Sequence, residues 1–131
     1  MALENPIPPS HHRGISLGVL KHRADFLRAA RGQRLHMPGF LIQARQRGAG
    51  EPVDPQIRVG FTCSKKVGNA VARNRAKRRL REIARMVLPI MGQPGWDYVL
   101  IGRAGVTADV PFSQLAHELE RALRKLHRPC Q

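Results

Sequence analysis

Acidic residues, aromatic residues and cysteines are all scarce in this sequence. Its 131 residues hold 9 Asp and Glu against 23 Lys and Arg, so the formal net charge is +14. The two cysteines, Cys63 and Cys130, lie far apart and form neither a disulfide framework nor a zinc-ligand pattern. An apolar signal-peptide segment is also missing near the N-terminus. These absences favour a reducing compartment, and we expect a cytoplasmic protein.

Long apolar runs are missing as well. No segment approaches the ~20 apolar residues of a membrane-spanning helix, and the amphipathic segments lack the aromatic anchors of an interfacial helix. We therefore expect no membrane association. A chain this basic is typical of nucleic-acid binding. Because Arg is more abundant than Lys, and its planar guanidinium suits phosphate and stacking contacts, RNA is the favoured partner.

The sequence offers no arrangement that indicates protein-based catalysis. It has no paired carboxylates, no Cys/His pair and no cluster of metal ligands. Cys63 ends an alternating apolar segment and has no identifiable base, so we interpret it as a core residue. His11 and His12 are adjacent in a Pro-rich arm, where such pairs are more often fortuitous than metal ligands. We assign them no role and predict no catalytic side chain.

The strongest signal is a basic stretch from Lys65 to Arg85. It contains one acid, Glu82, and nine basic residues: Lys65, Lys66, Arg73, Arg75, Lys77, Arg78, Arg79, Arg81 and Arg85. A solvated helix face usually mixes such residues with acids four positions away, and here only Arg78 and Glu82 form such a pair. Uncompensated like charges repel one another, so the pattern indicates a surface that a polyanion neutralises.

The same stretch predicts a helix that packs on a core. Its apolar residues recur every three or four positions, at Ala72, Ala76, Leu80, Ile83 and Val87. We expect Asn69 to cap this helix after a sharp turn at Gly68, and Pro89 to end it. The basic residues then lie outside the apolar stripe, on surfaces that a partner can reach.

The remaining segments predict one domain with a small sheet. Residues 1–18 are rich in Pro and show no period, so we expect a flexible N-terminal arm before a single domain over 19–128. Strand patterns cover three segments: 33–47 with a break at Pro38-Gly39, 56–64, and 97–101. The last is an unbroken apolar run, which places it mid-sheet. We predict an α/β (α+β) two-layer sandwich, with a mixed sheet of about four strands and three helices.

Two shorter segments predict the other helices. Residues 21–31 place Phe26, Leu27 and Ala30 on one side, with Gly32 closing the helix in the left-handed conformation. Phe26 is either a core residue or a platform for base stacking. The last helix begins at Pro111 and carries an apolar stripe of Leu115, Leu119, Ala122 and Leu126.

The segment GNAVARNRAKRRLRE, at 68–82, closely resembles the signature of the protein subunit of bacterial ribonuclease P. Further matching segments are LKHRADFLRAARG at 20–32, RVGFTCSKKVGNAV at 58–71 and DYVLIGRAG at 97–105. The resemblance covers roughly residues 18–127. It is specific, because RNR flanked by GNAV and KRRLRE directly after a strand is not a consequence of composition.

The resemblance implies a fold like that of a ribosomal protein domain, with a left-handed βαβ crossover through the basic helix. It also implies a monomeric subunit in a 1:1 complex with a large catalytic RNA. Such a subunit holds the single-stranded 5′ leader of precursor tRNA in a central cleft and raises the affinity for substrate and Mg²⁺. The enzyme removes the leader by phosphodiester hydrolysis, and the RNA with its Mg²⁺ ions carries out cleavage.

The same resemblance implies roles for individual residues. Contacts with the catalytic RNA fall on Lys65, Lys66, Arg73, Asn74, Arg75, Lys77, Arg78, Arg79 and Arg81, with Asn74 also able to meet a hydrated metal. The leader cleft falls on Phe26, Arg28, Phe40, Gln43 and Arg45. Many relatives have an aromatic residue where this chain has Ala30, and some have a tyrosine where it has Gln43. We therefore expect weaker base stacking in the cleft, or leader contacts through Arg28 and Arg45 instead.

Two other functions fit part of the pattern. A ribosomal or ribosome-associated RNA-binding protein would have the same charge and fold class but no link to cleavage. A protein-only nuclease or a DNA binder is disfavoured because acidic metal ligands are missing. Copurification with ribosomal subunits would support the first alternative, and metal-dependent cutting by the isolated chain would support the second.

Overall fold

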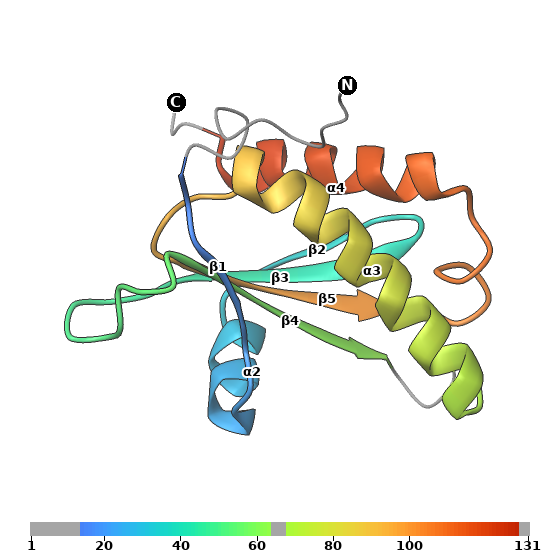
Figure 1. Ribbon diagram of the computed structural model, residues 1–131, viewed down its shortest axis with the longest axis horizontal. Helices are drawn as coiled ribbons and strands as arrows, with labels where there is room; N and C mark the ends of the chain where they lie inside the picture. Colours follow the sequence, from blue (N-terminus) through green and yellow to red (C-terminus); the bar gives the residue numbers. More distant parts are fainter. Residues whose placement is uncertain (1–13, 64–67, 129–131) are drawn as a thin grey trace, which may run out of the picture.

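The computed structural model describes residues 14–63 and 68–128, which fold into a five-stranded sheet with three helices (Figure 1). In chain order the elements are β1 (Leu17–Val19), α2 (Arg23–Ala30), β2 (Gln33–His36), β3 (Phe40–Gln46), β4 (Ile57–Cys63), α3 (Ala70–Met91), β5 (Trp96–Gly102) and α4 (Phe112–Leu126). Every predicted element is present, and β1 is an additional strand. The fold is therefore the predicted α+β class with five strands in place of about four.

The central strand of the sheet is β5. The spatial order is β1-β4-β5-β3-β2, with β4 parallel to β5 and β3 antiparallel to it. Tyr98, Val99 and Leu100 are each at most 1% exposed. The prediction that this apolar run lies mid-sheet and is buried on both faces is confirmed.

Strand β1 lies at the end of the segment predicted to be an N-terminal arm. It pairs in parallel with β4, with Leu17 opposite Ile57 and Val19 opposite Val59. The Leu20 N–H then donates to the Val59 carbonyl at 2.9 Å. A strand of three residues is too short to show an alternating pattern, so pairing with β4 defines it rather than local sequence. Residues 1–13 of the predicted arm lie outside the described residues.

Helix α3 connects the parallel strands β4 and β5. Both strands run toward the right in Figure 1, and α3 returns on the viewer's side of the sheet, from the end of β4 to the start of β5. This path is left-handed, opposite to the usual sense of such crossovers. Chirality rules alone favour the right-handed form, and the family resemblance implied the left-handed one.

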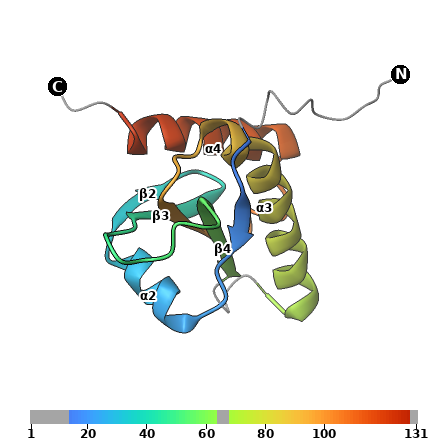
Figure 2. The ribbon, with the colours of Figure 1, turned by 60° about the vertical axis from the view of Figure 1, so that its left-hand side comes forward.

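Helices α3 and α4 cover one face of the sheet and form its main core, whereas α2 lies on the other face (Figure 2). Alternate residues of β3 therefore belong to different layers. Phe40, Ile42 and Ala44 are fully buried on the α3/α4 side. The smaller core under α2 contains Leu20, Ala29 and Val99. The sheet with α3 and α4 is the predicted two-layer sandwich, and α2 adds a short helix behind it.

Helix α3 forms as its sequence predicts at the N-terminus but extends further at the C-terminus. The Asn69 side chain accepts from the Ala72 N–H at 3.0 Å, and Gly68 adopts a φ of +136°. The expected end at Pro89 is wrong, because the helix continues to Met91. Proline removes one N–H donor, and the helix continues for two residues beyond it before Gly92. Although α3 has 22 residues, neither it nor another helix of the described residues is apolar enough to cross a membrane.

Helix α2 buries a different face from the predicted one. Asp25 and Ala29 face the sheet, Leu27 is half exposed and Ala30 is exposed. Gly32 does not adopt the predicted left-handed conformation. A Cβ at Gly32 would lie 2.2 Å from the Ala44 carbonyl oxygen, so glycine is required there by the close approach of β3.

A buried carboxylate fixes the turn between β2 and β3. Glu118 of α4 is 2% exposed and accepts from the Gly39 N–H at 2.7 Å. The Thr107 hydroxyl donates to the Gly39 carbonyl at 2.5 Å. Both polar groups of Gly39 are thereby satisfied by side chains distant in sequence, so Glu118 is explained by structure without a catalytic role.

Folding stability should decrease as the pH falls below about 6.5, because of His127 at the end of α4. Its Nε2 lies 2.6 Å from the Tyr98 hydroxyl, which also accepts from the Gln93 N–H at 3.0 Å. Burial lowers the pKa of His127. The unfolded chain therefore binds the proton more readily, and acidification favours unfolding. Urea titrations at pH 7.5 and 5.5 should show this loss, His127→Gln should reduce it, and exposed His36→Gln should not. An unchanged pH dependence in His127→Gln would refute this explanation.

Candidate nucleic-acid interface

The basic residues of α3 lie on two flanks and an outer ridge of the helix. The core side of α3 is formed by Ala76, Leu80 and Ile83, each fully buried against the sheet. Asn74, Arg75, Arg78 and Arg81 are exposed, whereas Arg73, Lys77 and Arg79 are half-buried. The predicted cationic surface on a packed helix is therefore present. Lys65 and Lys66, which were predicted to extend it, lie outside the described residues.

One flank of α3 carries Arg81 and Arg85 and faces Phe61 of β4. The Arg81 guanidinium carbon lies 5.5 Å from the centre of the Phe61 ring, a cation–π contact. Phe61, Arg81 and Arg85 border a groove of about 340 Å³ between α3 and the sheet edge. The Arg73 guanidinium donates to the Gly68 carbonyl at 2.6 Å. This flank thus combines cations with an aromatic ring, the combination that suits both phosphates and bases.

The other flank faces the loop between β5 and α4. Arg79 donates to the carbonyl oxygens of Thr107, at 3.2 Å, and Val110. These bonds give Arg79 a structural function, and its predicted contact with RNA stays a prediction. Arg75 and Arg103 border a hollow of about 490 Å³ beside the start of α3. The side chains of Arg75 and Arg78 make no hydrogen bond or ion pair with other described residues, so their positive charges are available to a partner.

Two of the predicted cleft residues, Phe26 and Gln43, line a hollow of about 450 Å³ beside α2. Phe26, Gln43, Thr62 and Ile101 line it, with Lys21 and Arg23 at its rim. Phe26 is half-buried over Gly60, where a Cβ would lie 2.5 Å from the ring. One part of the Phe26 ring therefore packs against the core under α2, and the rest of the ring faces the hollow. Phe61 borders both this hollow and the groove beside α3, so the two surfaces adjoin.

The structure does not bring all the predicted cleft residues together. Phe40 is fully buried in the main core on the opposite face, so assigning it to the cleft was wrong. The alternation of β3 places Gln43 and Arg45 on the α2 side and excludes Phe40 from it. Arg28 lies two positions after Phe26, about 200° further around α2. It therefore points into a different hollow, on the other side of this helix.

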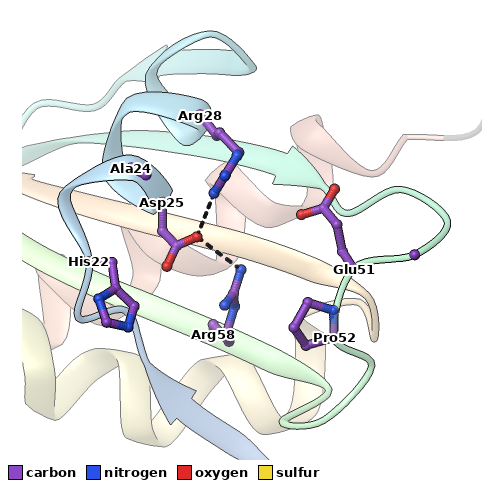
Figure 3. Close-up of a pocket in the computed structure, with 8 residues that line it drawn as sticks. His22, Ala24, Asp25, Arg28, Glu51, Pro52 and Arg58 are labelled. Atoms are coloured by element: carbon purple, nitrogen blue, oxygen red, sulfur yellow. Dashed lines mark hydrogen bonds and ion pairs between the residues drawn. The ribbon is translucent and has the colours of Figure 1, made fainter.

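That second hollow (Figure 3) adjoins a network that sequence reasoning missed, which we name the arginine cluster. It comprises four arginines and three carboxylates: Arg28, Arg45, Arg47, Arg58, Asp25, Glu51 and Asp97. Asp97 is fully buried and accepts from Arg47 at 2.7 Å and from Arg58 at 2.7 and 2.9 Å. Asp25 pairs with Arg28 at 2.8 Å and with Arg58 at 3.6 Å. These pairings tie α2 to the central strands.

The third carboxylate of the arginine cluster comes from the 48–52 loop. Glu51 accepts two bonds from the Arg45 guanidinium, at 3.0 and 2.5 Å, and one from the Gly48 N–H at 2.8 Å. The hydrogen bonds from Arg45 and the single bond from the Gly48 N–H lower the pKa of Glu51 to about 2. The positive charge of Arg28 acts in the same direction. Glu51 is therefore anionic at neutral pH. No pattern near Glu51 indicates this pairing, which depends on the path of the loop.

Cys63 and the described carboxylates show no arrangement for catalysis or metal binding. Cys63 is half-buried, with its Sγ 3.8 Å from the Arg73 carbonyl, and burial raises the pKa of its thiol. Cys63 was predicted to be a core residue, whereas the structure places it half-buried, packed closely against Gly102 outside the two cores. Within the described residues, no three His, Cys, Asp or Glu side chains are grouped to hold a metal ion. Asn74 is exposed on α3.

A packed helix with uncompensated cations, next to an aromatic hollow on a mixed sheet, defines an RNA-binding α+β protein. The family model for ribonuclease P matches residues 17–127. The chain is 66% identical over 113 residues to the ribonuclease P protein component of Ruegeria pomeroyi, covering 86% of this chain and 89% of that protein. It is 49% identical over 107 residues to the Caulobacter vibrioides component, covering 82% and 69%. The chain therefore belongs to the ribonuclease P protein family.

Solved structures of this family share the fold. The Staphylococcus aureus ribonuclease P protein at 2.0 Å aligns with a TM-score of 0.65 and 27% identity, covering 83% of this chain and 94% of that one. The Thermotoga maritima protein aligns with a TM-score of 0.63 and 27% identity, covering 79% and 91%. Membership makes this chain the protein component of the endoribonuclease that processes tRNA 5′ ends, and its partner is an RNA.

Proposed function

We propose that this chain binds the catalytic RNA of ribonuclease P through α3 and holds the 5′ leader of precursor tRNA against the α2 face of the sheet. The observation that carries the proposal is the cationic surface of α3. Arg75 and Arg78 are exposed and without a carboxylate partner among the described residues. Without an anionic partner, the repulsion between these positive charges would destabilise the folded protein. An RNA backbone neutralises it.

The adjoining hollow beside α2 supplies the proposed leader site. Phe26 offers part of an aromatic face, and Lys21 and Arg23 lie at the rim. A single-stranded leader could stack one base there while its phosphates meet the cations. Gln43, which stands where some relatives have a tyrosine, offers an amide to a base edge instead. Because the hollow reaches Phe61 and hence α3, one surface serves both RNAs.

In the proposed mechanism the protein contributes charge and position. Its cations reduce phosphate repulsion between the catalytic RNA and the substrate, which allows both to bind Mg²⁺ more tightly. Hydrolysis of the phosphodiester bond belongs to the RNA and its Mg²⁺ ions, and the protein supplies no catalytic side chain. We place this 1:1 complex of protein and RNA in the cytoplasm.

The test is cleavage of precursor tRNA at low Mg²⁺ by the cognate ribonuclease P RNA, with and without this chain. We expect stimulation that requires the RNA and yields correct 5′ ends. Glu82→Gln and His117→Gln, which alter exposed groups, should stimulate equally. Lost cleavage in either variant with normal RNA binding would contradict the mechanism. An RNA that gains nothing from the protein would favour a ribosomal binding function, and cutting by the protein alone would exclude RNA catalysis.

A further inference from the structure

The carboxylates of the arginine cluster differ in how firmly the fold holds them. Asp97 lies in the central strand with a side chain 1% exposed, and Asp25 lies on the sheet-facing side of α2 with a side chain 10% exposed. The Glu51 side chain is 26% exposed and is carried by a surface loop. Asp97 and Asp25 are therefore fixed parts of the structure, whereas Glu51 is the one that can leave with little rearrangement.

The partner of Glu51 is suited to a different anion. Arg45 presents its guanidinium edge to both carboxylate oxygens of Glu51, and the Arg45 side chain is 20% exposed. The same two parallel N–H bonds recognise two oxygens of a phosphate group. An incoming phosphodiester can thus take the place of the Glu51 carboxylate without a change in the Arg45 side chain.

Space for such a group lies beside this pair. The hollow between α2 and the 48–52 loop measures about 590 Å³ and is lined by His22, Arg28, Glu51 and Arg58 (Figure 3). Arg28, 48% exposed, lies on the opposite wall from Glu51. With its carboxylates ionised the arginine cluster has four positive and three negative charges, so departure of Glu51 raises its net charge from +1 to +2.

We propose that this hollow is a phosphate site for RNA and that Glu51 is its internal competitor. The carboxylate occupies Arg45 until a phosphodiester displaces it, and Arg28 provides the second positive wall. The site rests on the proposed RNA-binding function and lies across α2 from Phe26. RNA already held on α3 has a high effective concentration at the hollow and can displace Glu51. Free anions at low concentration cannot displace Glu51, so this carboxylate limits non-specific binding of anions to the hollow.

The test is the RNA affinity of the full chain with Glu51→Gln, measured by fluorescence anisotropy. Removing the competing charge should strengthen binding by about twofold to fivefold, the range expected for loss of an ion pair at the protein surface. Glu120→Gln is the matched control. It removes one carboxylate from an exposed pair with Arg124 on α4, at 3.7 Å, and should leave affinity within error. An equal gain in both variants would show a general charge effect and overturn the proposal.

A second variant separates phosphate binding from loosening of the loop. In the double variant Arg45→Gln with Glu51→Gln the gain should disappear, because the phosphate has lost its partner. A gain that persists without Arg45 overturns the proposal. Glu51→Asp keeps the charge but shortens the side chain, so it should show an intermediate gain. Thermal melts of each variant check that the chain remains folded.

The source of the phosphate is distinguished by the RNA used. A gain for precursor tRNA that grows with leader length, and is absent with mature tRNA, assigns the hollow to the leader. A gain with the catalytic RNA alone assigns it to that RNA. No gain with either overturns the inference. Wild-type stimulation of cleavage is measured in parallel, so failure of the proposed function appears as lost stimulation and failure of this site as an absent Glu51→Gln effect.

Discussion

Replacing Asp97 with Ala should lower the free energy of unfolding by about 3–5 kcal/mol, the cost of breaking a buried ion pair by removing one partner. Asp97 is fully buried in the central strand and receives Arg47 and Arg58. Without it, Arg47 keeps a charge on a side chain only 3% exposed, bonded solely to the carbonyls of Pro55 and Gln56 among the described residues. Leaving a buried cation without its counter-charge is costly, because the charge has lost both water and its partner.

Urea unfolding followed by circular dichroism measures this effect. Asp97→Asn retains the shape and one acceptor oxygen, so it should lose less stability than Asp97→Ala. Glu120→Ala, which breaks an exposed pair on α4, should change stability by less than about 1 kcal/mol. A loss below about 1 kcal/mol in Asp97→Ala would mean that water replaces the carboxylate readily. The arginine cluster would then not be the link between α2 and the sheet.

The sequence predicted well those elements whose buried side chains form a regular apolar pattern along a single segment. The stripe of α3 and the apolar run of β5 each place three or more side chains in the core, and both were located correctly. The prediction that Pro89 ends α3 was wrong, because the loss of one backbone N–H donor near the end of a long packed helix costs little stability. β1 has only three residues and is defined by its pairing with β4.

The candidate site was predictable to the extent that it lies on one helix. The α3 cations follow from spacing alone, whereas the cleft required knowing which faces of β3 and α2 meet. Phe40 could have been excluded from the alternation of β3, since it shares a face with core residues Ile42 and Ala44. The family resemblance placed Arg28 in the cleft with Phe26, although two positions along a helix turn their side chains to different sides. The pairing of Glu51 with Arg45 is set by loop closure, which no local pattern encodes.

Replacing both Arg75 and Arg78 with Ala should weaken binding of the catalytic RNA by at least about 10-fold for each lost contact at moderate salt, as expected when a hydrogen bond to a charged group is lost. Both side chains are exposed on α3 and have no partner within the described residues. The slope of log affinity against log salt should fall by about 0.7–0.9 for each lost phosphate contact. Stability should be unchanged or higher, because Ala is the better helix former and like-charge repulsion decreases.

Arg121→Ala with Arg124→Ala is the matched control, since it removes the same charge from exposed positions of α4. RNA titrations at several salt concentrations should show little change in slope for this pair. Equal losses in the two double variants would mean that RNA responds to net charge and not to α3. A normal slope in the α3 variant would place the RNA elsewhere on the molecule. Arg79→Ala differs from both, because losing its bonds to Thr107 and Val110 should destabilise the loop before α4 as well as change RNA binding.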